Sequence, residues 1–447
     1  MRHSEAPSDV EMTEKVAGEP FAIPRRVRSF PRFIVEIVGL LTVNLIARVS
    51  RIVFARRPRG VRQQKTMARK ARDDVTDSMF AEAARSQELL RAAELESRTL
   101  EFRLGGASTA LPPGVLVCVK VYYATDRNSV GRSEGTVDYQ GKRGDRLRYG
   151  TCEVTLPEDH RMGHLETPSI WRLEFGPNPA KHVVFEKAIE LPVDRFYDQL
   201  RGDVMNAASR ELFVFVHGFA NSFEDAARRT AQLSYDLGYK GIPVMYSWPS
   251  QGRISLGGYR YDETNIDWTI PHLRSFLFDL TKRSGADHIN LIAHSMGNRI
   301  LANAIVRLSA QVQQLGKPTF NHMVLTAPDI DAQVFKDDLI PEMKKVSKRV
   351  TLYASSEDKA LAFSKRIHGD YPRAGDTRPE IVVADGIDSV DVSQIDTYFF
   401  SVGHSYFGDN RTIISDLFLL FRDDSPPAQR NLLPQPSTAP KWWVFRP

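Results

Sequence analysis

The sequence predicts an α/β fold whose mostly parallel central sheet is covered by helices on both faces. After Glu211, short apolar segments alternate with amphipathic ones, as in the strand expected at 212–216 and the helix expected at about 222–237. Continuous apolar strands are typical of a parallel sheet that is buried on both sides. The composition agrees, because 42% hydrophobic and 26% charged residues exclude collagenous, coiled-coil and wholly disordered chains.

The other elements follow from the same patterns. Runs of β-branched and aromatic residues predict early strands at 115–123, 150–156, 170–175 and 183–189. Apolar runs predict later strands at 242–248, 289–293, 323–326 and 350–354. Apolar residues at three- and four-residue spacing predict helices at 264–283, 296–308 and 409–421.

A chain of 447 residues is longer than one ordinary domain requires. We expect one α/β domain at residues 114–422, with additional segments on both sides of it. Residues 1–24 lack apolar periodicity and are expected to be a disordered N-terminus. The remaining predicted segments are a basic amphipathic stretch at 25–72, a long helix with its linker at 73–113, and a Pro-rich C-terminal tail at 423–447. Trp442, Trp443 and Phe445 in this tail are candidates for docking on the rest of the protein.

Positive charge is concentrated near the N-terminus. The net charge is +5, but residues 1–72 hold 16 Lys and Arg against 6 Asp and Glu, a local +10 that leaves −5 for the rest. Apolar residues at helical spacing between 34 and 52, flanked by arginines, predict a helix in an anionic membrane interface. A spanning helix and a helix docked on the protein itself are the alternatives. Solubility of the full chain without detergent would contradict the anchor.

The excess of arginine after the apolar helix favours the cytoplasmic face of a membrane, and a cytoplasmic location is the alternative. Nucleic acid is not expected as a partner, because the arginines flank an apolar helix and do not alternate with stacking aromatics.

Cys118 and Cys152 lack metal or redox spacing and are interpreted as core residues. The sequence contains no phosphate loop, dinucleotide fingerprint or zinc spacing, so neither a cofactor nor a metal is predicted.

The most informative segment is an apolar strand that ends at Ala293 to Gly297 and continues directly into a helix. Ser295 lies between small residues at positions −2 and +2, which predicts a nucleophile elbow in this strand–turn–helix context. Small residues are needed there because the strand and the helix approach each other closely. Alanine occupies the first small position in place of the usual glycine. We therefore expect an α/β-hydrolase fold with Ser295 as its nucleophile.

A serine nucleophile needs a histidine base, which follows it in the chain of α/β-hydrolases. His404 follows a strand predicted at 397–401 and precedes the last helix, which is the expected place for the base. His322 lies at the start of a strand, on the wrong side of the sheet. His368 lies in a polar loop with no strand directly before it. The predicted base is therefore His404.

An acid must orient this base. Asp358 follows the strand predicted at 350–354, and the loop after that strand ordinarily supplies the acid. Asp329 and Asp331, after the preceding strand, are the alternatives.

The oxyanion of the reaction needs two backbone N–H donors. Met296, directly after the nucleophile, is expected to supply one. Phe219, in the loop that follows the strand at 212–216, is expected to supply the other. His217, two residues earlier, is interpreted as a buried structural residue, so that the loop donates and the imidazole does not.

Aromatic residues near the predicted site have two interpretations. They form a substrate pocket, or they pack beneath a loop. The Gly-containing segment at 252–263 is a candidate lid, and Asp126 and Arg127 are expected to pair with each other at a strand end. The predicted pocket residues are Trp248, Tyr259 and Tyr261.

Together these motifs resemble a bacterial family of α/β-hydrolases catalogued as esterase- or lipase-like proteins of unknown function. The resemblance covers residues 115–421 and implies a hydrolase fold with the Ser295 triad, but no substrate. The matching segments, in chain order, lie at 121–127, 149–150, 157–161, 216–223, 247–250, 258–262, 293–297, 327–331 and 403–406.

The predicted function is a serine hydrolase that cleaves a carboxylic ester or thioester through an acyl-enzyme near a membrane. Its substrate would be a small-molecule or lipid ester. An acyltransferase with the same triad is one alternative. A catalytically idle hydrolase fold that serves as a membrane-tethered interaction module is another.

Overall fold

The computed structural model describes residues 116–131, 136–166, 178–253, 255–314, 319–395, 410–435 and 441–446. The segments predicted at 1–24, 25–72 and 73–113, the strand at 170–175 and the loop that carries His404 lie outside these residues, so these remain predictions. Within the described part of the chain, no helix is both long and apolar enough to cross a membrane.

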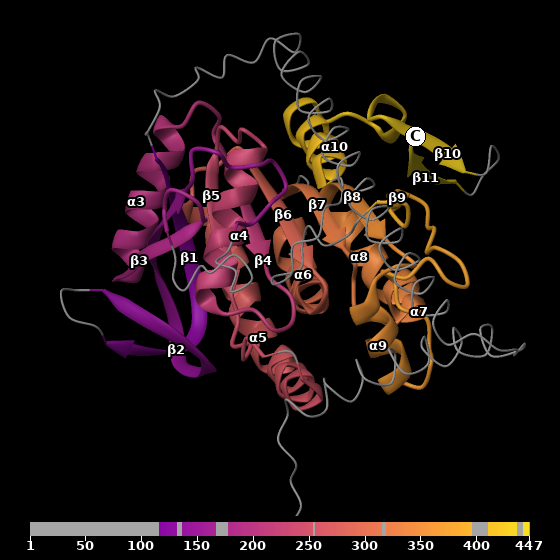
Figure 1. The fold of residues 1–447 in the computed structure, drawn as a ribbon, viewed down its shortest axis with the longest axis horizontal. Coiled ribbons are helices and arrows are strands. Elements are labelled where there is room, and N and C mark those ends of the chain that lie inside the picture. Colours follow the sequence, from indigo (N-terminus) through magenta and orange to yellow (C-terminus); the bar gives the residue numbers. More distant parts are fainter. Residues whose placement is uncertain are drawn as a thin grey trace, which may run out of the picture. The chain divides into compact units, whose positions relative to one another are not determined.

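One sheet runs through the described residues, in the strand order β10-β11-β9-β8-β7-β6-β4-β5-β1-β2-β3 (Figure 1). Pairing is parallel from β11 to β1 and antiparallel at both edges. The predicted α/β-hydrolase architecture, with a mostly parallel central sheet, is confirmed. The strands are β1 (Val117–Gly131), β2 (Val137–Leu156), β3 (Val184–Leu191), β4 (Glu211–Val216), β5 (Ile242–Ser247), β6 (His288–His294), β7 (Phe320–Thr326), β8 (Ser347–Ala354), β9 (Ile387–Asp391), β10 (Leu432–Gln435) and β11 (Trp442–Phe445).

Helices cover both faces of this sheet, because successive strand side chains point to opposite sides. In β4, Leu212 and Val214 belong to the core beneath α3, α5, α6 and α8, whereas Phe213 and Phe215 belong to the core beneath α4 and α10. The helices are α3 (Val193–Asn206), α4 (Phe223–Asp236), α5 (Leu256–Arg283), α6 (Met296–Gln313), α7 (Ala332–Val334), α8 (Ile340–Val346), α9 (Lys359–Ile367) and α10 (Asn410–Asp423).

Helix α5 corrects the prediction of a lid at 252–263. Residues 256–263 form its first turns, eight residues earlier than the predicted start of the helix. The side chain of Ser255 accepts a hydrogen bond from the Gly258 N–H at 2.9 Å. This N-cap satisfies a first-turn donor and offsets the poor helix propensity of the two glycines that follow.

The predicted C-terminal tail is wrong for residues 432–435 and 442–445, which join the sheet, while residues 427–429 form a short 3-10 helix. Strand β11 pairs in parallel with β9, and β10 pairs with β11 at the sheet edge. Pro434 is tolerated in β10 because an edge strand leaves one row of backbone groups without a neighbour. Trp443 and Phe445 pack against the core beneath α10. The proline content alone was therefore a misleading signal.

A buried histidine ties the loop at 157–166 to α4. The His160 ring lies between the carboxylates of Glu166 and Asp236, with both N···O distances at 2.8 Å. Burial opposes the charge of this ring, but hydrogen bonds and attraction from Asp236 and Glu166 prevail and raise its pKa to about 9. The imidazolium is the form that this pair of carboxylates stabilises.

We expect the stability of the protein to depend on this histidine at alkaline pH. The folded-state pKa exceeds the unfolded value of about 6.5, so the contribution is complete below pH 6.5 and is lost as the pH rises through 9. The free energy of unfolding should fall by about 3 kcal/mol across this window. Urea denaturation of wild type and His160→Gln at several pH values measures it, and an equal fall in both proteins would contradict the prediction.

Candidate active site

Ser295 lies at the sharp turn between β6 and α6. Its backbone has φ 50° and ψ −123°, a left-handed conformation that costs energy for a residue with a side chain. The Ser295 N–H donates to the Thr326 carbonyl at 3.0 Å. The Asn298 side-chain amide donates to the carbonyls of Ser295 at 3.1 Å and Thr326 at 2.8 Å. The strained turn is therefore held by the neighbouring strand β7 and by α6.

Close approach explains the small residues around this turn. A Cβ on Gly297 would lie 2.4 Å from the His217 carbonyl oxygen, and a Cβ on Gly218 would lie 3.0 Å from the Cβ of Ser295. Ala293 is fully buried beside Val216 of β4. The structure thus has the strand–turn–helix geometry of a nucleophile elbow, while the chemical role of Ser295 stays a prediction.

One predicted oxyanion donor, Met296, directly follows Ser295, and the other, Phe219, directly follows Gly218, whose backbone approaches Ser295 closely. Met296 is the first residue of α6. Its N–H therefore has no acceptor within the helix, as holds for the N–H groups of any first helical turn. The Gly218 carbonyl accepts from Asn221 Nδ2 at 3.2 Å and from His217 Nδ1 at 2.9 Å. Because the carbonyl and the next N–H point in opposite directions across a trans peptide, these bonds also orient the N–H of Phe219.

His217 has the structural role that we inferred for it. Its ring is buried and stacks on Trp248, with centroids 5.2 Å apart. Burial and the nearby Arg127 charge hold the pKa of His217 well below its usual range. The ring is therefore neutral, with Nδ1 donating to the Gly218 carbonyl and Nε2 accepting from Arg127 at 3.3 Å.

Asp358, the predicted acid, caps α9 after strand β8. Its Oδ1 accepts from the N–H groups of Ala360 at 2.8 Å and Leu361 at 3.0 Å. Burial raises the pKa of this carboxyl, and the nearby carboxylates of Asp329 and Asp376 act in the same direction. Both capping bonds use Oδ1, so within the described residues Oδ2 has no hydrogen-bond donor.

The two alternative acids are engaged elsewhere. Asp329 accepts from the hydroxyls of Tyr259 at 2.7 Å and Ser364 at 2.5 Å, and lies 3.4 Å from Nε of Arg373. Asp331 caps α7 by accepting from two backbone N–H groups. Asp329 is thus held by two hydroxyl donors, on α5 and α9, and by an ion pair with Arg373.

Neither described histidine downstream of Ser295 is placed as its base. His322 is buried in the first half of β7, and burial lowers its pKa to about 4. The elbow lies beside the other end of that strand, where Ser295 bonds Thr326. His368 has Nδ1 2.8 Å from the Ser364 carbonyl and Nε2 2.9 Å from Glu263, so both nitrogens face acceptors. His404 lies outside the described residues and stays a prediction.

The structure favours packing over a pocket for two of the three predicted pocket residues. Trp248 has no exposed surface, and its Nε1 donates to the His217 carbonyl at 2.7 Å. Tyr259 is 4% exposed, contacts the Phe219 ring and donates to Asp329. Both side chains contact the loop at 217–221, which carries the predicted oxyanion donor Phe219 and is called the predicted oxyanion loop below. Tyr261 is half-buried on α5, and its role stays a prediction.

The predicted pairing of Asp126 with Arg127 is wrong. Asp126 is bonded by Tyr246 at 2.9 Å, by His272 at 3.0 Å and by Thr269. Arg127 points to other partners, because consecutive residues of a strand point to opposite faces. Arg127 and Asp262 form a buried polar framework around the loop at 217–221. The sequence analysis did not predict this framework. The only sequence signal for it was that Arg127 and Asp262 both lie within motifs that carry the family resemblance.

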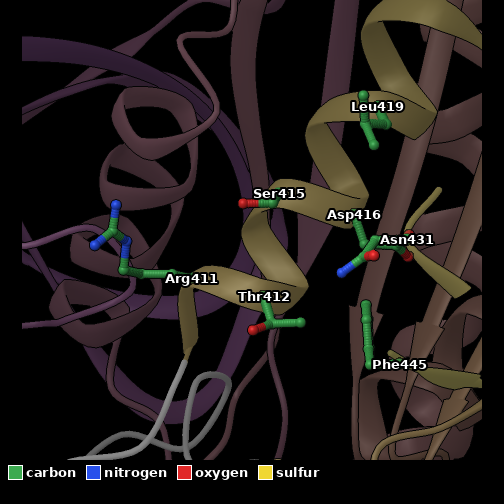
Figure 2. Close-up of a pocket in the computed structure, with 7 residues that line it drawn as sticks. All are labelled: Arg411, Thr412, Ser415, Asp416, Leu419, Asn431 and Phe445. Atoms are coloured by element: carbon green, nitrogen blue, oxygen red, sulfur yellow. The ribbon is translucent and has the colours of Figure 1, made fainter. Parts of the chain in front are cut away.

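A cavity of about 170 Å³ lies between α10 and the C-terminal strands, and its lining includes none of the predicted site residues (Figure 2). Its lining residues are Arg411, Thr412, Ser415, Asp416, Leu419, Asn431 and Phe445. Within the described residues, no cluster of His, Cys, Asp and Glu could hold a metal ion.

A family model described as alpha/beta hydrolase of unknown function (DUF900) matches residues 194–420, half of the chain. The chain belongs to this family. The DUF900 match runs from α3 into α10 and includes the elbow, the predicted oxyanion loop and all three candidate acids. It confirms a hydrolase fold and leaves the substrate unassigned.

Solved structures similar to this DUF900 protein include hydrolases. A putative cell surface hydrolase from Lactobacillus plantarum is 13% identical, with 49% of this chain and 97% of that chain covered and a TM-score of 0.29. An esterase from Pyrobaculum calidifontis is 10% identical, with coverage of 52% and 94% and a TM-score of 0.25. An uncharacterised protein from Capnocytophaga ochracea is 13% identical, with coverage of 70% and 66% and a TM-score of 0.29. No curated protein matches the chain.

Proposed function

We propose that this DUF900 protein is a serine hydrolase that cleaves a carboxylic ester or thioester through an acyl-enzyme. The observation that carries the proposal is the strained Ser295 turn, with the Ser295 Cβ against the backbone of Gly218. A strained serine at a strand-to-helix turn exposes its Oγ to substrate. The adjacent loop and helix start supply N–H groups where negative charge would develop.

In the proposed reaction, Ser295 Oγ attacks the acyl carbonyl while His404 accepts the hydroxyl proton. The N–H groups of Phe219 and Met296 stabilise the oxyanion, and Asp358 orients the His404 ring. Collapse of the tetrahedral intermediate expels the alcohol or thiol, which takes the proton from His404. Water then attacks the acyl-enzyme by the same route and releases the acid.

A fluorophosphonate probe tests this proposal. The probe should label wild type at one serine, located by mass spectrometry in the peptide containing Ser295, and Ser295→Ala should not be labelled. Ser309→Ala is the matched control, because this serine lies on the same helix, where it donates to Glu342 at 2.6 Å, and it should label like wild type. Labelling of Ser295→Ala would overturn the assignment.

The same experiment separates the alternatives. An acyltransferase would form the same acyl-enzyme but transfer the acyl group to added alcohols, which product analysis detects. Complete absence of labelling in the folded wild type would favour an idle fold that serves in interactions. A position near a membrane remains a proposal that rests on the basic segment at 25–72 alone.

A further inference from the structure

Arg127 is a fully buried arginine in the second half of strand β1, two residues after the part that pairs with β5. It is 1% exposed and ranks among the largest side chains without contact to solvent in the described part of the chain. Its guanidinium reaches three separate elements. Its hydrogen-bond partners are Ser247 Oγ at 2.8 Å, the Ser250 carbonyl at 2.8 Å, the Asn221 carbonyl at 2.8 Å, His217 Nε2 at 3.3 Å and the Gln140 carbonyl at 3.4 Å.

These partners are unusual for a buried cation, because within the described residues none of its hydrogen bonds goes to a carboxylate. Burial lowers the pKa of Arg127 to about 10, while more distant carboxylates, led by Glu224 and Asp262, act against this fall. Burying a charge without a directly bonded counter-ion is costly. The cost is offset here because the guanidinium donates to three carbonyls, one hydroxyl and one ring nitrogen in fixed positions. The geometry of these acceptors, more than charge pairing, explains why an arginine is buried at this position.

Two of the residues bonded by Arg127, Asn221 and His217, hold backbone carbonyls of the predicted oxyanion loop in place. Asn221 uses its side-chain amide to hold the carbonyls of Gly218 at 3.2 Å and Phe219 at 2.7 Å. His217 uses Nδ1 to hold the Gly218 carbonyl. Arg127 bonds the backbone of Asn221 and the other ring nitrogen of His217. The Arg127 guanidinium therefore bonds both residues, His217 and Asn221, whose side chains orient the Gly218–Phe219 peptide.

Asp262 holds the same loop from another side. Its carboxylate accepts from the N–H of Ala220 at 3.2 Å, from the N–H of Gln251 at 2.9 Å and from the hydroxyl of Ser250. Ala220 has φ 57°, so the loop is strained and would relax without such bonds. Ser250 is bonded by both Asp262 and Arg127, which joins the two supports.

We propose that Arg127 is a positioning residue for the oxyanion hole, which directs the Phe219 N–H toward the reacting carbonyl through His217 and Asn221. This role rests on the proposed function. Lysine would keep the charge but could not replace the planar five-donor guanidinium. Misdirecting one oxyanion donor costs about 10²- to 10³-fold in the rate of the chemical step.

The kinetics of fluorophosphonate labelling test the proposal, because phosphonylation of the serine also places an oxygen in the oxyanion hole. Arg127→Lys should lower the saturating rate constant kinact about 10²-fold and leave the binding constant KI within about threefold, since only the transition state uses the displaced donor. Arg430→Lys is the matched control. Arg430 is equally buried but bonds Asp416 on α10, so this variant should lose thermal stability and keep kinact.

The outcomes are distinguishable. No labelling of wild type overturns the proposed function itself. Labelling of wild type with equal kinact in Arg127→Lys, or an equal loss in Arg430→Lys, overturns the role of Arg127. If Arg127→Lys does not fold, Ser247→Ala removes one acceptor of the guanidinium, and unchanged kinact in that variant overturns the role as well.

Discussion

Replacing Asp358 by asparagine is expected to lower the rate of acyl transfer by about 10³- to 10⁴-fold, the scale that follows loss of the orienting acid from a triad. The fold should survive, because asparagine is as good an N-cap as aspartate and its carbonyl can accept the same α9 bonds. What is lost is the carboxylate that would bind the imidazole of His404. Fluorophosphonate labelling and thermal denaturation measure the two effects separately.

Two aspartate variants serve as comparisons. Asp331→Asn also changes an N-cap carboxylate, so it has the same capping chemistry and should keep wild-type labelling. Asp329→Asn removes a carboxylate that accepts from two hydroxyls and pairs with Arg373, so it should lower stability by about 1–3 kcal/mol with a smaller loss of rate. If Asp329→Asn loses more rate than Asp358→Asn, Asp329 is the acid.

Replacing Gly297 by alanine should be among the most disruptive single changes in this protein. The added Cβ would lie 2.4 Å and 2.5 Å from the carbonyl oxygens of His217 and Val216. These are backbone atoms at the end of β4, so helix α6 must move away from the strand. We expect a loss of about 3 kcal/mol or more in the free energy of unfolding and loss of labelling, because the elbow and the predicted oxyanion loop separate together.

Gly202 provides the control for this substitution. It lies in α3, where an added Cβ meets nothing within 4 Å, so Gly202→Ala should stabilise the protein by about 0.5–1 kcal/mol. Urea denaturation of both variants measures the difference. If Gly297→Ala unfolds at the wild-type urea midpoint, the prediction is wrong. The elbow would then tolerate a wider separation of helix α6 from strand β4 than the backbone contacts of Gly297 imply.

The elbow and the sheet could be predicted from sequence because their signals are local. Ser295 is marked by its immediate neighbours and by the strand and helix that adjoin it, all within one continuous segment. Asp358 is marked in the same way by β8. The alternation of strands and helices predicted a parallel sheet, since burial on both faces makes each strand apolar throughout.

Composition predicted the structure less well where a few tertiary contacts determine the conformation of a segment. The proline-rich C-terminus indicated a tail, yet two short strands in it find an open sheet edge beside β9. The sequence indicates only that Trp248 is an aromatic residue in a segment close to the predicted site. The residues that flank it in the chain do not indicate that its ring stacks on His217. Such outcomes depend on which surface is available when the chain has folded.

The sequence by itself determined the fold class, the Ser295 turn and the residues that follow each strand. Only the tertiary structure decided that Arg127 and Asp262 enclose the predicted oxyanion loop. The bonds of Arg127 to Asn221, Ser247 and Ser250 join residues 94, 120 and 123 positions apart. Periodicity reports whether a residue is buried, but a buried polar group is stabilised by specific partners. Those partners are brought together only when β1, β4 and β5 pair in the sheet.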